Sequence, residues 1–395
     1  MTNLFMFEKP LGMRDTFPDL YEIKDQTKKK MEQAMKLWGY RFIETPSLEY
    51  YETVGEASAI LDQQLFKLLD QQGHTLVLRP DMTAPIARVA ASKLLKEEAP
   101  LRLAYSNSVF RAQQREGGRP AEFEQVGIEC IGDDSVSADA EVIALMVSVL
   151  KEAGLEHFKI SIGHIGFVQE LFTQIVGTEE RADTLRRYLY EKNYVGYRQH
   201  VNELALSSID KERLFRFLQL RGSEDVLGEA YALLEGGKGL GALEQLKDLW
   251  SILKDYEVEK YVKFDLSLVS HMSYYSGILF EVYGENVGFA IGNGGRYNKL
   301  LEKFGKNSGA TGFGLRLDYV LEAMQVELSS TLQQCVLFSD ERRKEAIGLA
   351  RDLRNEGVEV VLQNWKGVGD VDEFTKVFSN VHFVVGQDRK GGETS

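Results

Sequence analysis

The chain contains the stretch Val109-Phe110-Arg111-Ala112-Gln113, followed after four residues by Gly118-Arg119-Pro120-Ala121-Glu122-Phe123-Glu124-Gln125-Val126-Gly127-Ile128-Glu129. The pattern predicts a strand, a basic loop that carries Arg111 and Arg119, and a returning strand. Because side chains alternate along a strand, Gln125, Gly127 and Glu129 share one face. Two polar groups with a glycine between them favour the floor of a small-ligand pocket. An ordinary exposed hairpin with a charged loop would show the same short pattern.

Three further segments follow the same order along the chain as in a known family. They read Lys9-Pro10-Leu11-Gly12-Met13-Arg14-Asp15, Leu78-Arg79-Pro80-Asp81-Met82-Thr83-Ala84, and Gly294-Gly295-Arg296-Tyr297-Asn298 with Gly312-Phe313-Gly314. Together the four segments resemble the histidyl-tRNA synthetases of class II, with 109–129 similar to motif 2 and the last segment similar to motif 3. The resemblance covers roughly residues 5 to 325.

The resemblance implies an α+β fold in which helices flank an antiparallel class II sheet. It places a core at 1–325, with a mainly helical insertion at about 170–255. Residues 331–395 read as alternating strands and helix and resemble a truncated anticodon-binding domain. The length of 395 residues agrees with two or three domains.

Composition excludes several classes of protein. Two distant cysteines and no clustered histidines argue against a disulfide framework, a metal site or another cofactor. No apolar run is long enough to span a bilayer, and the N-terminus lacks the order of a signal peptide, so we expect a cytoplasmic protein without a membrane partner. A net charge of -13 weighs against a dedicated nucleic-acid binder.

An amphipathic helix is predicted near the N-terminus, where apolar or semi-polar residues from Ile23 to Trp38 recur with helical spacing. A predicted strand at 40–43 follows, and Pro46 ends it. Helix, strand and proline are also the order of motif 1, which forms the dimer interface of class II synthetases. The resemblance therefore implies a dimer, whereas the pattern alone would equally fit a helix packed on its own core.

Asp81 and Thr83 follow a predicted hairpin and begin a predicted helix at about 84–95. Both residue types are common helix N-caps. A carboxylate and a hydroxyl at this point could also hold an ammonium group, and the resemblance places both residues where the family holds the α-amino group of histidine. The family usually has glutamate at the position of Asp81, so the carboxylate here is one methylene shorter.

The segment Ser270-His271-Met272-Ser273-Tyr274-Tyr275-Ser276-Gly277 resembles a second histidine-specific element of the family. The resemblance implies that Tyr274 or Tyr275 offers a hydroxyl to one imidazole nitrogen while Glu129 accepts from the other. Arg111 and Gln125 would lie at the carboxylate of the ligand. Strand packing is the ordinary alternative for a tyrosine pair.

The departures from the family concentrate on its ATP-binding half. Ser270, Tyr319 and Ala121 stand where the family has arginines, and Gln113 replaces an acidic residue. Arg316 replaces a glycine where the adenine lies in the family. Losing a single electrostatic stabiliser can cost roughly 10²–10³ in rate, so we expect negligible adenylation. Residues 331–395 hold nine Lys or Arg against eleven Asp or Glu, a net charge of -2, which argues against tRNA binding.

A histidine pocket without adenylation chemistry resembles the histidyl-tRNA synthetase paralogues that serve as regulatory subunits of ATP phosphoribosyltransferase. That resemblance implies a non-catalytic role in the first step of L-histidine biosynthesis. It implies a hetero-oligomer with the short-form catalytic subunit, built on a regulatory-subunit dimer, and L-histidine as the feedback effector. A divergent histidyl-tRNA synthetase and a histidine sensor with another partner remain as alternatives.

Overall fold

The computed structural model describes residues 7–58, 60–95, 100–112, 120–270, 274–326 and 333–386. The chain divides into two compact units, Met1–Val326 and Glu327–Ser395. Each unit has its own hydrophobic core.

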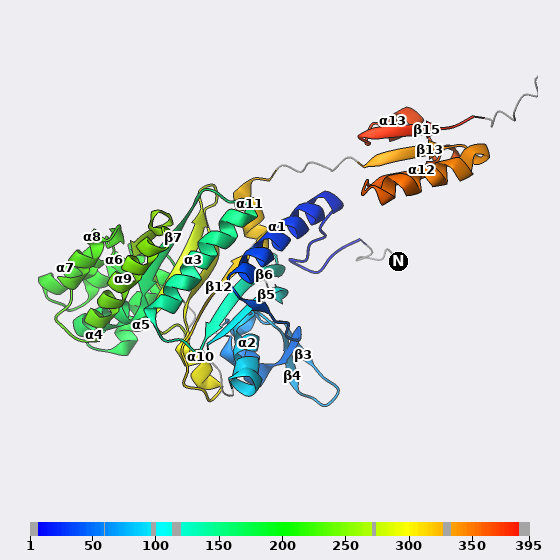
Figure 1. Ribbon diagram of the computed structural model, residues 1–395. Helices are drawn as coiled ribbons and strands as arrows, with labels where there is room; N and C mark the ends of the chain where they lie inside the picture. Colours follow the sequence, from blue (N-terminus) through cyan, green and yellow to red (C-terminus); the bar gives the residue numbers. More distant parts are fainter. Residues whose placement is uncertain are drawn as a thin grey trace, which may run out of the picture. The chain divides into compact units, whose positions relative to one another are not determined.

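The larger unit is built on a sheet of nine described strands (Figure 1). The order across the sheet is β1 (Arg41–Phe42), β5 (Leu101–Phe110), β6 (Glu122–Ile131), β12 (Ala310–Arg316), β11 (Ala290–Arg296), β10 (Ile278–Gly284), β7 (Phe158–His164), β9 (Val262–Asp265) and β8 (Arg221–Gly222). The neighbouring strands β1 and β5 are parallel, as are β7 and β9, and all other neighbouring strands are antiparallel. The predicted strand at 40–43 is thus a two-residue edge strand.

Apolar side chains cover both faces of this sheet. One face packs against α1 (Pro18–Leu37), α3 (Val136–Ala153) and α11 (Leu317–Met324). The other face packs against α2 (Thr83–Val89), α10 (Asn298–Lys303) and a small antiparallel sheet of β2 (Leu48–Tyr50), β4 (Thr75–Leu78) and β3 (Lys67–Leu69). The helix predicted at 84–95 is shorter in the structure, because α2 ends at Val89 and Ala90–Leu94 form a π-helical turn. In this turn the Leu95 N–H donates to the Ala90 carbonyl at 2.9 Å.

The predicted insertion consists mainly of helices that gather beside β7 (Figure 1). They are α4 (Ile165–Val176), α5 (Glu179–Tyr190), α6 (Tyr194–Glu203), α7 (Ser208–Phe217), α8 (Asp225–Tyr231) and α9 (Lys238–Asp255). A short 3₁₀ turn at Glu259–Tyr261 leads back into the sheet.

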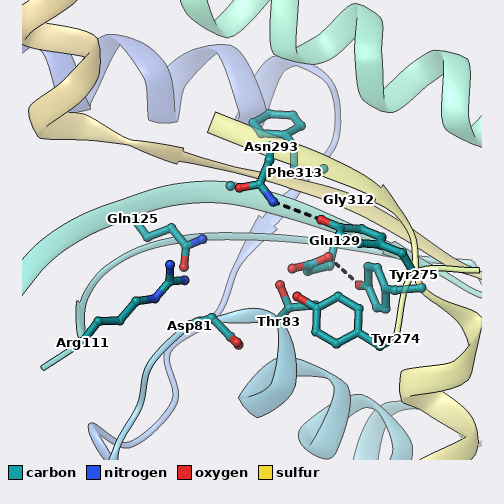
Figure 2. Close-up of a pocket in the computed structure, with 13 residues that line it drawn as sticks. Asp81, Thr83, Arg111, Gln125, Glu129, Tyr274, Tyr275, Asn293, Gly312 and Phe313 are labelled. Carbon is teal, nitrogen blue, oxygen red and sulfur yellow. Dashed lines mark hydrogen bonds between the residues drawn. The ribbon is translucent and has the colours of Figure 1, made fainter. Parts of the chain in front are cut away.

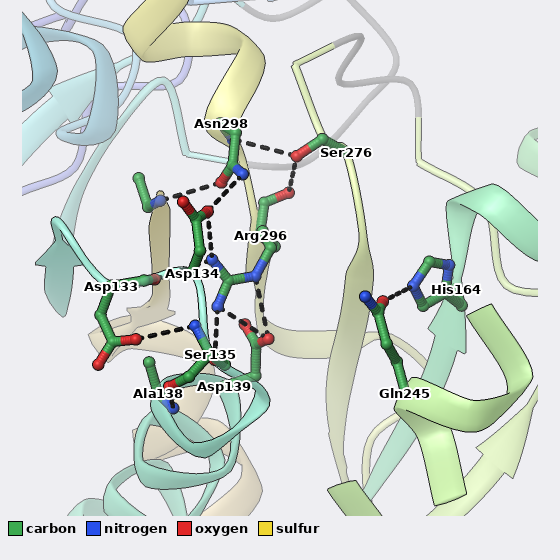
Figure 3. A network of polar contacts seen from close by, with 11 residues as sticks. Asp133, Asp134, Ser135, Ala138, Asp139, His164, Gln245, Ser276, Arg296 and Asn298 are labelled. Carbon is green, nitrogen blue, oxygen red and sulfur yellow. Dashed lines mark hydrogen bonds and ion pairs between the residues drawn. The ribbon is translucent and has the colours of Figure 1, made fainter. Parts of the chain in front are cut away.

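A buried histidine joins this insertion to the sheet (Figure 3). His164 ends β7, and its Nδ1 accepts a hydrogen bond from the Gly166 N–H at 3.0 Å. The proton therefore sits on Nε2, which donates to Gln245 Oε1 on α9 at 2.8 Å. Burial lowers the pKa of His164 to about 4, so this link is neutral at physiological pH.

The smaller unit is an α/β domain with an entirely parallel three-stranded sheet in the order β14-β13-β15. Its elements are β13 (Gln334–Phe338), α12 (Arg343–Asn355), β14 (Val360–Asn364), α13 (Val371–Thr375) and β15 (Asn380–Val384). The core between the sheet and α12 holds Val336, Phe338, Ala346, Ala350, Val360 and Val384.

Candidate ligand-binding site

The floor of the site is β6, where the predicted alternation is confirmed. Gln125 and Glu129 are buried on the site face, and Val126 and Ile128 lie in the core that α3 covers. The neighbouring strand β12 sets Gly312 opposite Glu129. A Cβ built on Gly312 would lie 2.1 Å from Glu129 Oε2, and one on Gly314 would lie 2.3 Å from Gln125 Nε2. Glycine at these two positions therefore leaves the room that the polar side chains occupy.

All seven side chains predicted for the site line one pocket (Figure 2). They are Asp81, Thr83, Arg111, Gln125, Glu129, Tyr274 and Tyr275, joined by Asn293, Gly294, Tyr297, Gly312, Phe313 and Gly314. The cavity is small, at about 20 Å³, and is partly open to its surroundings.

Asp81 combines both roles that its sequence position allowed. Its Oδ1 accepts a hydrogen bond from the Ala84 N–H at 3.0 Å, so it caps α2. Its Oδ2 is buried and has no hydrogen-bond partner among the described residues. Burial raises the pKa of Asp81 to about 6, against the opposing effect of the nearby Arg111 guanidinium. A cationic N–H donor would satisfy the remaining oxygen.

Glu129 likewise keeps one oxygen open. Its Oε2 accepts a hydrogen bond from the Tyr297 hydroxyl at 2.5 Å. Its Oε1 is buried without a hydrogen-bond partner in the described ranges. Burial raises the pKa of Glu129 to about 8, although the hydrogen bond from Tyr297 and the nearby Thr83 hydroxyl act in the other direction. A buried carboxyl with one open oxygen suits an N–H of a polar ring.

The aromatic wall consists of Tyr274, Tyr275 and Tyr297. The Tyr274 ring centre lies 5.1 Å from that of Tyr275 and 6.1 Å from that of Tyr297. The Tyr275 hydroxyl accepts a hydrogen bond from Asn293 Nδ2 at 3.2 Å and keeps its own proton to donate. Sequence reasoning gave no role to Tyr297 or Asn293. Strand pairing across β10, β11 and β12 brings them to the site, and no local pattern signals that pairing.

The backbone at 80–82 holds the remaining two polar groups. Arg111 Nε donates to the Pro80 carbonyl at 2.8 Å, and Gln125 Oε1 accepts from the Met82 N–H at 3.2 Å. Figure 2 shows the two side chains next to each other at one end of the pocket. The Gln125 amide N–H₂ and the Arg111 guanidinium place N–H donors at this end, and such donors suit an anionic group. Arg119, the second cation of the predicted loop, lies outside the described residues.

Two family models match the chain. The model described as histidyl-tRNA synthetase matches residues 12–320, and the one described as histidyl-tRNA synthetase HisZ, C-terminal domain, matches residues 335–386. An ATP phosphoribosyltransferase regulatory subunit from Geobacillus sp. (strain WCH70) is 60% identical over 387 residues, which cover 98% of this chain and 99% of the relative. The chain belongs to the family of ATP phosphoribosyltransferase regulatory subunits.

Other regulatory subunits are similar to this chain over nearly its whole length. The one from Bacillus subtilis (strain 168) is 58% identical over 383 residues, covering 97% of this chain and 98% of the relative. A crystal structure described as an ATP phosphoribosyltransferase regulatory subunit/histidyl-tRNA synthetase from Bacillus halodurans C shares 56% identity, covers 97% of this chain and 99% of its own, and superposes with a TM-score of 0.90. These matches confirm the predicted class II synthetase-like fold and the interpretation as a regulatory subunit.

In this regulatory subunit Arg316 stands where the family has a glycine beside the adenine, and its side chain packs against aromatic rings. The guanidinium carbon of Arg316 lies 3.7 Å from the Phe123 ring centre and 3.8 Å from the Tyr319 ring centre. Asp318 holds the same guanidinium at 2.9 Å. Cation–π contacts with two rings and an ion pair thus hold this guanidinium in place. Ala121 is fully buried, and Gln113 lies outside the described residues.

The described ranges contain neither a candidate membrane span nor a candidate metal site. No helix there is long and apolar enough to cross a bilayer, and no three His, Cys, Asp or Glu side chains are close enough together to hold a metal ion.

Proposed function

We propose that this regulatory subunit binds free L-histidine in the pocket of Figure 2, hereafter the histidine pocket. We further propose that it acts with the short-form catalytic subunit of ATP phosphoribosyltransferase and confers feedback inhibition on the first step of L-histidine biosynthesis. One observation carries the ligand assignment: two buried carboxyl oxygens, Asp81 Oδ2 and Glu129 Oε1, lack partners among the described residues. Both side chains line the same small pocket as Arg111.

The donors and acceptors of histidine match this arrangement group by group. Its ammonium would contact Asp81 and Thr83. Its imidazole would donate to Glu129 and accept from a hydroxyl of Tyr274 or Tyr275. Its carboxylate would lie at Arg111 and Gln125. The contacts to Asp81 and Glu129 each satisfy a buried oxygen that would otherwise cost about 1–3 kcal/mol.

A regulatory role sets a thermodynamic condition on the histidine pocket. A ligand acts as an effector only if it binds one conformation better than another. The effect of histidine on the partner must equal the effect of the partner on histidine affinity.

The subunits themselves provide the test of this function. The short-form catalytic subunit should show full phosphoribosyltransferase activity only when mixed with this chain, and histidine should inhibit the mixture. The chain alone should give histidine-dependent ATP–pyrophosphate exchange at background, since Arg316 packs against Phe123 where the family has a glycine beside the adenine. Exchange clearly above a protein-free control would instead support a divergent histidyl-tRNA synthetase, and an inactive mixture would contradict the partner assignment.

Histidine affinity should fall as the pH drops below about 6, the raised pKa of Asp81. The ammonium of the ligand favours ionised Asp81, so protonation of this carboxylate opposes binding, by up to about tenfold per pH unit. Calorimetry from about pH 5 to pH 8 should show this trend in the wild type, on top of the ligand's own imidazole titration near 6.5. Asp81→Asn keeps the imidazole contribution and removes that of the carboxylate. Parallel curves for the two proteins would contradict the contact.

We also propose a homodimer through the N-terminal elements. Large apolar side chains are exposed on α1, on the edge strand β1 and on β2, namely Leu20, Tyr21, Leu37, Phe42, Leu48 and Tyr50. Packing against a second copy would remove these apolar side chains from water. Light scattering should give twice the chain mass of 44.7 kDa, and Phe42→Glu should shift the population toward monomer. A wild-type monomer that persists with the catalytic subunit present would count against this interface.

A further inference from the structure

A second cavity of about 300 Å³ lies in the larger unit between the sheet and the helical insertion. Strands β7, β9 and β10 supply one wall, and the connection between α5 and α6 supplies another, together with β8. The volume reaches the lower end of the range for small-molecule sites. The lining residues are Ser161, Leu189, Tyr190, Lys192, Tyr194, Arg221, Lys263, Asp265, Ser267, Leu268, Val269, Glu281 and Tyr283.

The second cavity opens on the same sheet face as the histidine pocket. Ser161 pairs with Glu281, and Glu281 pairs with Asn293, so these side chains form one row across β7, β10 and β11. Glu281 lines the second cavity, whereas Asn293 lines the histidine pocket and donates to Tyr275. Paired side chains lie about 5 Å apart. Ligands in the two cavities would therefore be separated by roughly one strand.

Three cations line the second cavity, and only one is neutralised by a carboxylate. Arg221 Nε lies 3.1 Å from Asp265 Oδ1, and its guanidinium also donates to Ser267 and Tyr194. These contacts fix its orientation. Within the described ranges, Lys192 Nζ contacts the Tyr283 hydroxyl, at 3.3 Å, and the face of that ring.

Lys263 has neither a hydrogen bond nor an ion pair in the described part of the chain, although it is the register partner of Ser161 on this face. The other carboxylate in the lining, Glu281, accepts from the Tyr283 hydroxyl. Positive charge therefore exceeds negative charge locally, on a chain whose net charge is -13.

The backbone at Lys192 is unusual. Its φ is +54°, a left-handed conformation that follows the end of α5. Glycine or asparagine is usual at such a position, and the backbone of any other residue is strained there. The amine of this lysine lies at the second cavity, so the strained position supplies a cation that glycine would lack.

We propose that the second cavity binds a small phosphate monoester, with its phosphoryl group on Lys192, Lys263 and Arg221. A phosphate monoester offers three terminal oxygens to two ammonium groups and a fixed guanidinium, and it matches these donors better than a single carboxylate does. Leu189, Leu268 and Val269 offer apolar surface to the organic part of the ligand. Because the second cavity lies beside the histidine pocket, we assign this ligand the role of a second effector. Only this effector role rests on the proposed function.

Calorimetry on the intact chain without histidine tests the site by itself. The probes are inorganic phosphate and phenyl phosphate, with phenol as the uncharged control. Phenyl phosphate should bind more tightly than phosphate, and phenol should not bind. Lys192→Ala and Lys263→Ala should each weaken phosphate binding at least about tenfold, since each removes a charged hydrogen-bond donor. Both lysines are exposed, so the fold should tolerate either change.

Lys247→Ala is the matched control, because Lys247 is an exposed lysine on α9 outside the second cavity. It should leave phosphate affinity unchanged. The proposal is overturned if wild-type protein shows no saturable phosphate binding at millimolar concentrations, or if Lys192→Ala and Lys263→Ala bind as well as Lys247→Ala. Repeating the titration with histidine should change both affinities by one common factor. Two intact but independent sites would overturn the effector part only.

Discussion

Replacing Glu129 with alanine should weaken histidine binding by roughly 5- to 150-fold. The change removes the open Oε1 that would accept the imidazole N–H, and a buried N–H without a partner costs about 1–3 kcal/mol. Calorimetry measures this loss directly. In the assembled enzyme the same variant should require a correspondingly higher histidine concentration for inhibition. Activity without histidine should stay near normal, since the catalytic chemistry belongs to the partner.

Two further substitutions separate a binding effect from a folding effect. Glu129→Gln keeps an acceptor for the Tyr297 hydroxyl and removes the buried charge. The folded pKa of Glu129 is about 8, above its ordinary value of 4.5. The folded state therefore holds this proton more tightly, and wild-type stability falls as the pH rises from about 4.5 to 8. Glu129→Gln lacks that penalty. Its melting temperature should therefore increase relative to that of the wild type as the pH rises through this window.

Glu122→Ala is the control for position on the strand, because Glu122 is exposed at the start of β6. It should leave histidine affinity unchanged. Unchanged affinity in Glu129→Ala as well would place the effector site elsewhere.

Local pattern was enough to predict the floor of the histidine pocket. The period of two along 122–131 set Gln125 and Glu129 on one face, and a Cβ on Gly127 would lie 2.1 Å from the Phe313 carbonyl oxygen. Family resemblance supplied Asp81, Thr83 and the tyrosine pair. The structure adds that Asp81 divides its two oxygens between a helix cap and the pocket. That division depends on the precise start of α2, which composition does not specify.

Contacts between distant strands could not be predicted in this way. Tyr297 reaches Glu129 across 168 residues of sequence, and Arg316 reaches Phe123 only because β12 pairs with β6. Residue spacing carries no direct signal of such pairings. The second cavity depends on how the insertion packs against β7, β9 and β10, which is equally non-local.

Replacing Arg296 with methionine should destabilise the larger unit by about 3–5 kcal/mol, the usual cost of breaking one side of a buried ion pair. Arg296 ends β11, and its guanidinium lies 2.9 Å from Asp139 Oδ2 on α3 (Figure 3). It also donates to the Asp133 and Ser135 carbonyls, each at 2.9 Å. The Asp139 side chain is only 2% exposed, so the variant would strand a buried carboxylate.

Urea unfolding followed by tryptophan fluorescence measures this loss. The chain has three tryptophans, of which Trp365 lies in the smaller unit. On a Trp365→Phe background, Trp38 and Trp250 report on the larger unit alone, which avoids averaging two unfolding transitions. Arg186→Met is the matched control. It removes an arginine that pairs with Glu179 and Asp183 on the surface of α5, where an ion pair is worth at most about 1 kcal/mol.

A double substitution distinguishes a stranded charge from lost packing. Burial raises the pKa of Asp139, and Arg296 opposes that rise. Without Arg296 the carboxyl group should take up a proton more readily, so adding Asp139→Asn should recover part of the lost stability. If Arg296→Met alone costs no more than Arg186→Met, the pair does not hold β11 to α3. Tyr297 follows Arg296 directly and donates to Glu129. If Arg296 fixes the position of β11, Arg296→Met should therefore also bind histidine more weakly. The double variant should recover part of this affinity.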